Sequence, residues 1–132
     1  MQEPQNGNWW LIVKDAKIGD IKIGYWPNEL FTHLANNASV IRYGGIAGGY
    51  STKKPTPPMG NGHLPNKDYR KACSLRTMKI VDDKGVLVDF DPSKIRGKQD
   101  TIKSCYDLEF DGYVDKEIEL AMTFGGPGGM CP

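Results

Sequence analysis

The glutamates are the first candidates for acid–base chemistry in this chain. Its glutamates number five, Glu3, Glu29, Glu109, Glu117 and Glu119. Hydrolysis by two carboxyl groups needs one ionised group to activate water and one protonated group to protonate the amide. Glu29 falls in the first turn of a predicted helix, where it favours the helix dipole. Glu117 and Glu119 alternate with apolar residues, as the solvated face of a strand does. The glutamates alone therefore predict no acid–base pair.

The histidines and cysteines give no metal pattern. His33 lies in the predicted helix and His63 in a glycine-rich loop, with no cysteine or carboxylate at ligand spacing, so we expect no zinc site. Residues 107–112 are similar to the start of a calcium-binding EF-hand loop, but the twelfth position is Ile118 instead of a glutamate. Cys73 lies within an apolar–polar alternation, and this pattern predicts that it is a small buried side chain. We expect no metal and no cofactor.

The elements that must position these residues are mostly strands. The chain has 16 glycines and 9 prolines, and the segments between them are rich in β-branched and aromatic residues, which predicts an all-β sandwich or barrel. The turn Asp82–Gly85 should form a hairpin, with glycine available for the left-handed position. Predicted strands are Trp9–Lys14, Ile21–Trp26, Val40–Tyr43, Ala72–Val81, Val86–Phe90, Tyr106–Phe110 and Ile118–Phe124.

One short helix, one long loop and one domain complete the prediction. Pro27 suits the first helical position, and the apolar residues that follow predict a helix over Pro27–Ala38. Gly48–Lys71 carries four prolines and little periodicity, which predicts a long surface loop. A chain of 132 residues is one domain by length.

Five motifs occur in a characteristic order. They are Asn8-Trp9-Trp10-Leu11, Gly24-Tyr25-Trp26-Pro27, Tyr43-Gly44-Gly45, Met59-Gly60-Asn61-Gly62-His63-Leu64-Pro65 and the C-terminal Gly125-Gly126-Pro127-Gly128-Gly129-Met130-Cys131-Pro132. From about Asn6 onward, the chain resembles the C-terminal half of the neprosin family of secreted plant proteins. Active members are metal-free glutamic endopeptidases that cut after proline at acid pH.

The resemblance implies a fold and a site. The fold would be an antiparallel β-sandwich, jelly-roll or lectin-like, to which this chain contributes about half of the strands. Its apolar faces would then need an N-terminal half or a second copy to cover them. The family's first catalytic glutamate lies in the N-terminal half, and the second would stand at Ile46, which cannot transfer a proton. The resemblance also implies a Cys105–Cys131 disulfide.

Aromatic residues are candidates for binding a ligand. Trp10, Tyr25, Trp26 and Tyr43 could stack on a proline ring or a sugar face, although aromatic residues in strands more often fill a core. Adjacent Trp9 and Trp10 must point to opposite faces of a strand, so one of them is a groove candidate. His63 belongs to the segment that is similar to the family's Met-Gly-x-Gly-His-Phe-Pro, and we interpret it first as a loop anchor.

Composition excludes some partners and leaves three functions open. With 17 basic and 16 acidic side chains spread along the chain, no basic surface indicates nucleic acid, and no apolar run is long enough to span a membrane. The resemblance implies a secreted protein, in which Asn37-Ala38-Ser39 would be a glycosylation triplet. The leading hypothesis is a degenerate or partial peptidase module that still binds proline-containing peptide or wall polymer. The alternatives are a working prolyl endopeptidase seen in part and a glycan-binding β-sandwich.

Overall fold

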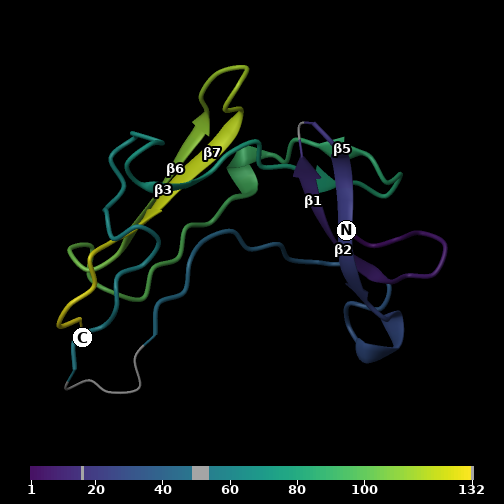
Figure 1. The fold of residues 1–132 in the computed structure, drawn as a ribbon, viewed down its shortest axis with the longest axis horizontal. Coiled ribbons are helices and arrows are strands. Elements are labelled where there is room, and N and C mark those ends of the chain that lie inside the picture. Colours follow the sequence, from purple (N-terminus) through teal and green to yellow (C-terminus); the bar gives the residue numbers. More distant parts are fainter. Residues whose placement is uncertain (16, 49–53, 132) are drawn as a thin grey trace. The chain divides into compact units, whose positions relative to one another are not determined.

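The computed structural model describes residues 1–15, 17–48 and 54–131. The chain divides into two compact units, the first made of Met1–Arg42 and Val81–Val86 and the second of Tyr43–Ile80 and Leu87–Pro132 (Figure 1). Its sheets are antiparallel and its only helices, among the described residues, are two single turns. The prediction of an all-β, antiparallel fold is confirmed, and three separate sheets are compatible with a sandwich-like arrangement.

The first unit is built on one hairpin. Strand β1, Trp9–Asp15, pairs with β2, Gly19–Trp26, and a bulge interrupts their register between Leu11 and Ile12. Both strands were predicted from their alternating apolar residues, and both are confirmed. None of the buried apolar residues that form the core lies in this unit, so many large apolar side chains of the hairpin are partly exposed.

The predicted helix over Pro27–Ala38 is wrong. Only the 3-10 turn η1, Asn28–Leu30, forms, and Phe31 already has extended dihedrals. Two carbonyls of the expected helix accept hydrogen bonds from distant side chains, Leu34 from Trp9 Nε1 at 2.8 Å and Ala35 from Gln2 Nε2 at 2.8 Å. A helix this short is marginal alone, so these tertiary hydrogen bonds decide the conformation.

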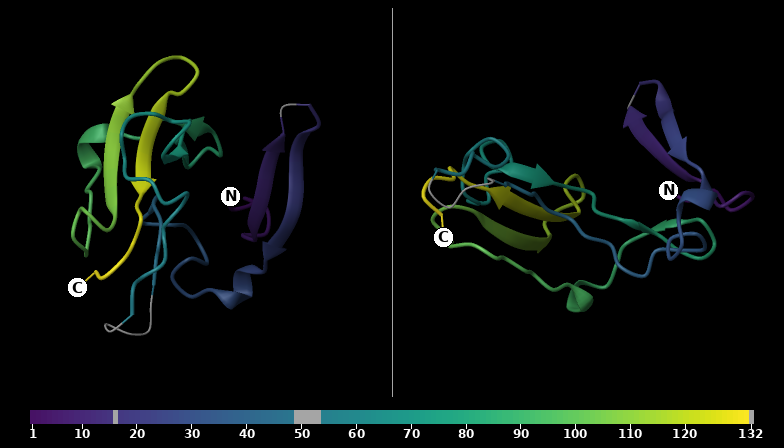
Figure 2. Two further views of the ribbon diagram at one scale, coloured as in Figure 1. Left: turned by 60° about the vertical axis from the view of Figure 1, so that its left-hand side comes forward. Right: turned by 90° about the horizontal axis from the view of Figure 1, so that it is seen from below.

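A three-stranded sheet organises the second unit. Strand β7, Leu120–Gly125, lies between β3, Cys73–Leu75, and β6, Asp107–Tyr113, and every residue of β7 is buried. Figure 2 shows these teal, yellow and green strands side by side. Their registers place apolar partners in rows on one face, which packs into the core with Met78 and Leu120. That face consists of Cys73, Leu75, Leu108, Phe110, Met122 and Phe124.

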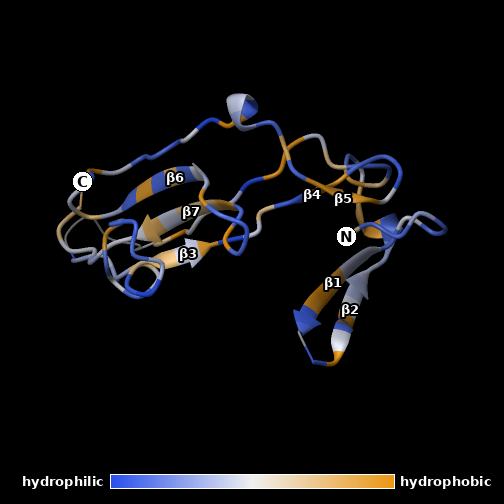
Figure 3. Cartoon of the chain, turned by 90° about the horizontal axis from the view of Figure 1, so that it is seen from above, coloured by the Kyte–Doolittle hydropathy of each residue, from blue (hydrophilic) through white to orange (hydrophobic). Residues whose placement is uncertain are grey.

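The opposite face of this sheet is polar. Ser74, Thr123 and Glu109 form a row across the three strands, one register position away from the apolar rows. Figure 3 shows the matching alternation of apolar and polar residues along β6. The period of two in the sequence therefore sorts the side chains onto the two faces.

Two other strand predictions need correction. The predicted strand Ala72–Val81 is broken, because Thr77 has a positive φ of 54°, and it continues only as β4, Ile80–Val81. Val40–Tyr43 forms no strand, since the described residues offer it no strand partner and Val40 remains 69% exposed.

The predicted hairpin after β4 is confirmed. Strand β4 pairs with β5, Leu87–Val88, across the turn, and Gly85 has a φ of 79°. A second 3-10 turn, η2, Pro92–Lys94, follows and is capped by Asp91.

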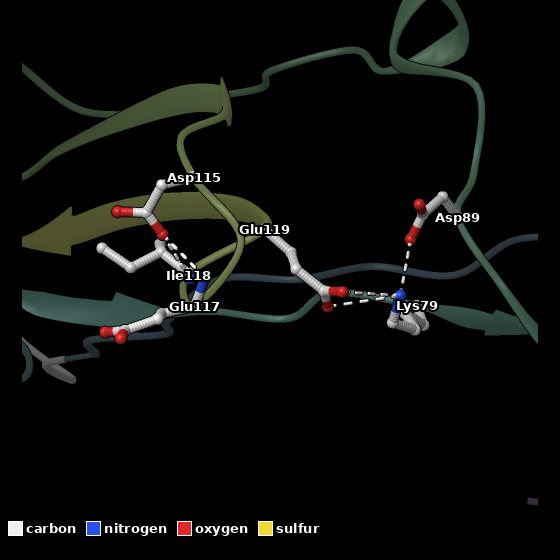
Figure 4. A network of polar contacts seen from close by, with 6 residues as sticks. All are labelled: Lys79, Asp89, Asp115, Glu117, Ile118 and Glu119. Carbon is white, nitrogen blue, oxygen red and sulfur yellow. Dashed lines mark hydrogen bonds and ion pairs between the residues drawn. The ribbon is translucent and has the colours of Figure 1, made fainter.

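Glu117 and Glu119 do not lie on a strand face as predicted. Glu117 is in a turn whose backbone N–H groups donate to Asp115, and Glu119 has a φ of 55° just before β7 begins. The Glu119 side chain lies near Lys79 Nζ, which also contacts Asp89 Oδ1 at 2.9 Å (Figure 4). The turn directs the Glu119 side chain toward Lys79. Glu119, Lys79 and Asp89 therefore form one ion-pair network.

The described part of the predicted Gly48–Lys71 loop is tied to the C-terminal segment. Bridges join Thr56 to Gly129 and Met59 to Gly126, and residues 49–53 lie outside the described residues. The disulfide implied by the resemblance is present, with Cα atoms of Cys105 and Cys131 6.1 Å apart. Among residues 1–15, 17–48 and 54–131, no helix is long and apolar enough to cross a membrane.

Candidate functional site

A small hollow lies beside the paired glycines Gly44 and Gly45. Its volume is about 120 Å³, well below that of a pocket for a drug-sized ligand. Met59, Leu108 and Phe124 supply its apolar lining. The rest of its lining is Tyr43, Lys98, Gln99, Asp100, Thr101, Tyr106 and Asp107. All of these residues belong to the second unit.

Gly45 must be a glycine for steric reasons. A Cβ atom there would lie 2.6 Å from Met59 Sδ and 2.8 Å from the Phe124 ring, far inside van der Waals contact. The backbone at Gly45 therefore packs directly on the apolar residues that line the hollow. This close approach explains why the motif needs a residue without a side chain at this position.

Ile46, at the expected position of the second catalytic glutamate, follows this contact. Its side chain is 99% exposed, so it makes almost no packing contribution. An isoleucine can neither accept nor donate a proton, and therefore the residue next to the hollow offers no acid–base chemistry.

Tyr43 is held at its hydroxyl and at its ring. Its hydroxyl donates to the Lys79 carbonyl at 2.9 Å, and its ring stacks on Phe90 with centroids 6.1 Å apart. Burial raises the pKa of Tyr43, so the hydroxyl keeps its proton. Tyr43 thus lines the hollow as a fixed aromatic wall.

Two carboxylates in the hollow were missed at the sequence level. Asp100 and Asp107 both line it, yet only glutamates were considered as replacements for the missing one. Asp107 Oδ1 accepts a hydrogen bond from the Leu108 N–H at 2.9 Å. The position of Asp107 at the start of a predicted strand was the available sign that this carboxylate has a fixed place in the fold. Nothing in the sequence indicates that it lies near Gly45.

The other aromatic candidates lie in the first unit. Trp10 and Tyr25 are cross-strand partners with ring centroids 4.9 Å apart, and Lys22 Nζ lies 4.6 Å from the Trp10 ring. Trp26 pairs instead with Trp9 and is 51% exposed. The hairpin therefore carries one aromatic pair on each face. The structure groups these residues with each other in one unit, whereas Tyr43 and His63 belong to the second unit.

His63 and Asn37 are both exposed. The His63 N–H donates to Asn61 Oδ1 at 3.2 Å, and its carbonyl lies close to Gly125, so the backbone fixes this residue in the loop. His63 does not line the hollow. Asn37 is accessible, as a glycosylation acceptor must be.

The described residues contain no group of three or more histidine, cysteine, aspartate or glutamate side chains that could hold a metal ion. The segment that is similar to an EF-hand loop is strand β6 in the structure. Cys73, the free cysteine, is partly buried against the core, as its alternating pattern predicts.

Comparison with known proteins identifies the family. No solved structure matches this chain. The family model described as Neprosin matches residues 1–127. Because this match covers almost the whole sequence, the chain belongs to the neprosin family.

Proposed function

We propose that this chain is a secreted, non-catalytic neprosin module that binds proline-containing peptide at the hollow beside Gly44 and Gly45. The observation that carries the proposal is the combination of a hollow with apolar, aromatic and polar lining residues and Ile46 next to it. The hollow offers binding, whereas the residue expected to supply the second glutamate offers no proton transfer.

The chemistry of the hollow favours a small apolar group on an extended peptide. Met59, Leu108 and Phe124 provide apolar contact, and Tyr43 provides an aromatic wall on which a proline ring can pack. Gln99 Nε2 donates to the Tyr106 carbonyl, which leaves the Gln99 side-chain oxygen to accept from a peptide N–H. The apolar and aromatic lining residues favour a proline ring over a sugar unit with its hydroxyl groups.

Secretion is part of the proposal. The Cys105–Cys131 disulfide is the kind of bond that persists in oxidising compartments. Asn37 is exposed, as glycosylation of a secreted chain requires.

Two other functions have specific support. Asp100 and Asp107 line the hollow and favour a working peptidase in which aspartates replace the glutamate. The neighbouring rings of Trp10 and Tyr25, of which Tyr25 is 51% exposed, favour a wall polymer or glycan as ligand, because exposed aromatic rings stack on sugar faces. Partly exposed apolar residues on the same hairpin favour self-association or a covering N-terminal segment.

A Thr101→Phe variant tests the binding site. Thr101 lines the hollow and its hydroxyl makes no hydrogen bond among the described residues, so phenylalanine fills the hollow without breaking a polar contact. If the peptide can no longer bury one apolar side chain in the hollow, binding loses about 1.5–3 kcal/mol, which weakens it roughly 10- to 150-fold. Calorimetry with a proline-containing hexapeptide measures the change.

Thr32→Phe is the matched control, because Thr32 is exposed and lies in the first unit. It should bind the peptide as the unmodified chain does. Equal binding by Thr101→Phe would move the site away from the hollow. Retention on a glycan column with no peptide binding would favour the glycan-binding alternative.

A further inference from the structure

A buried polar cluster on the second face of the β3–β7–β6 sheet has no role in the site described above. Thr123 is 0% exposed, and its Oγ1 has no hydrogen-bond partner among the described residues. Both carboxyl oxygens of Asp111 are also buried and have no partner of good geometry there. A buried carboxyl group and hydroxyls that lie close together without well-formed hydrogen bonds are costly, so these atoms call for a physical explanation.

A β-bulge places Asp111 in this cluster. The pairing of β6 with β7 shifts between Phe110 and Gly112, and Asp111 is the extra residue. Bulges redirect a side chain while the strands on either side stay paired. Asp111 thereby comes close to Thr123 and Glu109 on the polar face, while Phe110 packs against the core.

The surroundings of Asp111 favour a protonated carboxyl group. Burial raises the pKa of Asp111, the hydroxyls of Tyr69 and Thr123 and the charge of Lys67 lower it, and the charge of Glu109 raises it. The net direction is upward. The pKa of Tyr69 is also raised, first by burial and then by Asp111, with smaller contributions from Asp115 and Glu109.

Tyr69 belongs to a segment that lies against this face. Lys67 Nζ is 3.3 Å from Glu109 Oε1, and Lys67 has a φ of 60°, which is unusual for a side chain of its size. The Asp68 carbonyl accepts from the N–H groups of Lys71 and Ala72 at 2.9 and 3.1 Å. Residues 67–71 are therefore a compact turn that contacts the sheet through Lys67 and Tyr69.

We propose that Asp111, Tyr69 and Thr123 form a proton-dependent latch that holds residues 67–71 on the sheet at acid pH and releases them as the pH rises. A protonated Asp111 is neutral and can donate a hydrogen bond to the oxygen of Thr123 or Tyr69. An ionised Asp111 places a second negative charge beside Glu109 in a buried position. The exposed Lys67–Glu109 ion pair is too weak to hold the segment alone.

The direction of the pH dependence follows from linkage. The pKa of Asp111 in the closed state is raised above its ordinary value of 3.8, which we take for the open state. At pH values between 3.8 and the raised pKa, the closed state therefore binds more protons than the open state. The latch is strongest below pH 3.8 and weakens as the pH rises through the raised pKa. This inference does not depend on peptide binding at Gly44–Gly45.

Release of the latch would change a second surface. Lys67, Asp68, Tyr69 and Arg70 form one side of an open hollow, and Arg76, Glu117 and Ile118 form the other. Movement of residues 67–71 would therefore alter the shape and charge of this hollow.

Hydrogen exchange of the Lys71 and Ala72 amides tests the latch in the whole chain. Protection factors, corrected for the intrinsic pH dependence of exchange, are compared at about pH 4 and about pH 7.5. We expect protection to fall at the higher pH, by about tenfold for each unit by which the pKa of Asp111 is raised. In Asp111→Asn, which cannot ionise, protection should be the same at both pH values.

Two further variants predict opposite shifts. Tyr69→Phe removes a hydroxyl that lowers the pKa of Asp111, so the fall in protection should move to higher pH. Glu109→Gln removes a like charge and frees Lys67, so the fall should move to lower pH. Both shifts can be measured even if Asp111→Asn does not fold.

Asp83→Asn, in the exposed hairpin turn, is the control and should behave as the unmodified chain. Equal protection at both pH values in the unmodified chain would overturn the latch, as would an equal fall in Asp111→Asn. Shifts of the same sign in Tyr69→Phe and Glu109→Gln would also overturn it.

Discussion

Replacing Phe124 with alanine is expected to lower the stability of the second unit by about 3–5 kcal/mol, the usual cost of removing a buried aromatic side chain. Phe124 is 9% exposed, and it pairs with Cys73 on one side and Leu108 on the other. It is also the ring on which Gly45 packs. Its removal would leave a cavity between the core and the hollow, so peptide binding should be lost as well.

The measurement must report on the second unit. All three tryptophans lie at positions 9, 10 and 26 in the first unit, so their fluorescence is a poor probe of the change. Urea unfolding followed by far-ultraviolet circular dichroism, with hydrogen exchange of β6 and β7, gives the required reading. Phe31→Ala is the control, because Phe31 lies outside the core cluster. A loss below about 1 kcal/mol for Phe124→Ala would contradict the assigned core.

Removal of the disulfide is the second large effect. In the double variant Cys105→Ser, Cys131→Ser, the chain-entropy model predicts a loss of about 3.5 kcal/mol for residues separated by 26 positions. The bond also lies next to contacts that tie the proline-rich loop to the C-terminal segment. The Tyr106 hydroxyl is 2.6 Å from the Pro57 carbonyl oxygen, and Thr56 Oγ1 is 3.2 Å from Cys131 Sγ.

Urea unfolding with and without reductant checks this expectation. Reductant should destabilise the unmodified chain to the level of the double variant and leave the double variant unchanged. Cys73→Ala keeps the disulfide and is the control for loss of a thiol. Equal stability of the unmodified chain and the double variant would show that the C-terminal segment needs no covalent link.

Strands with a clear apolar alternation could be predicted from the sequence. Strands β1, β2, β6 and β7 lie close to their predicted positions because their side chains must sort onto two faces. The positive φ of Thr77 could not be predicted from the sequence. The single strand predicted over Ala72–Val81 is therefore two separate strands in the structure. The helix over Pro27–Ala38 was predicted from a real apolar periodicity, but it does not form. Side chains distant in the sequence donate hydrogen bonds to the backbone carbonyls of this segment.

The candidate site was predictable only in part. The motif Tyr43-Gly44-Gly45 indicated where to look, and Tyr43 does line the hollow. Residues 98–101, Asp107 and Phe124 reach the same hollow from distant parts of the chain. No local pattern could reveal that arrangement. Asp111 escaped notice for a similar reason, because its burial depends on a bulge and on a loop more than 40 positions away.

The most direct test is digestion of a proline-containing peptide library at acid pH, read by mass spectrometry, with the unmodified chain and Ile46→Glu. Ile46 offers no proton transfer, and a single restored glutamate supplies only half of a catalytic pair. We therefore expect no cleavage by either protein. Cleavage after proline by the unmodified chain would contradict the proposal of a non-catalytic module and would make Asp100 and Asp107 the first residues to replace.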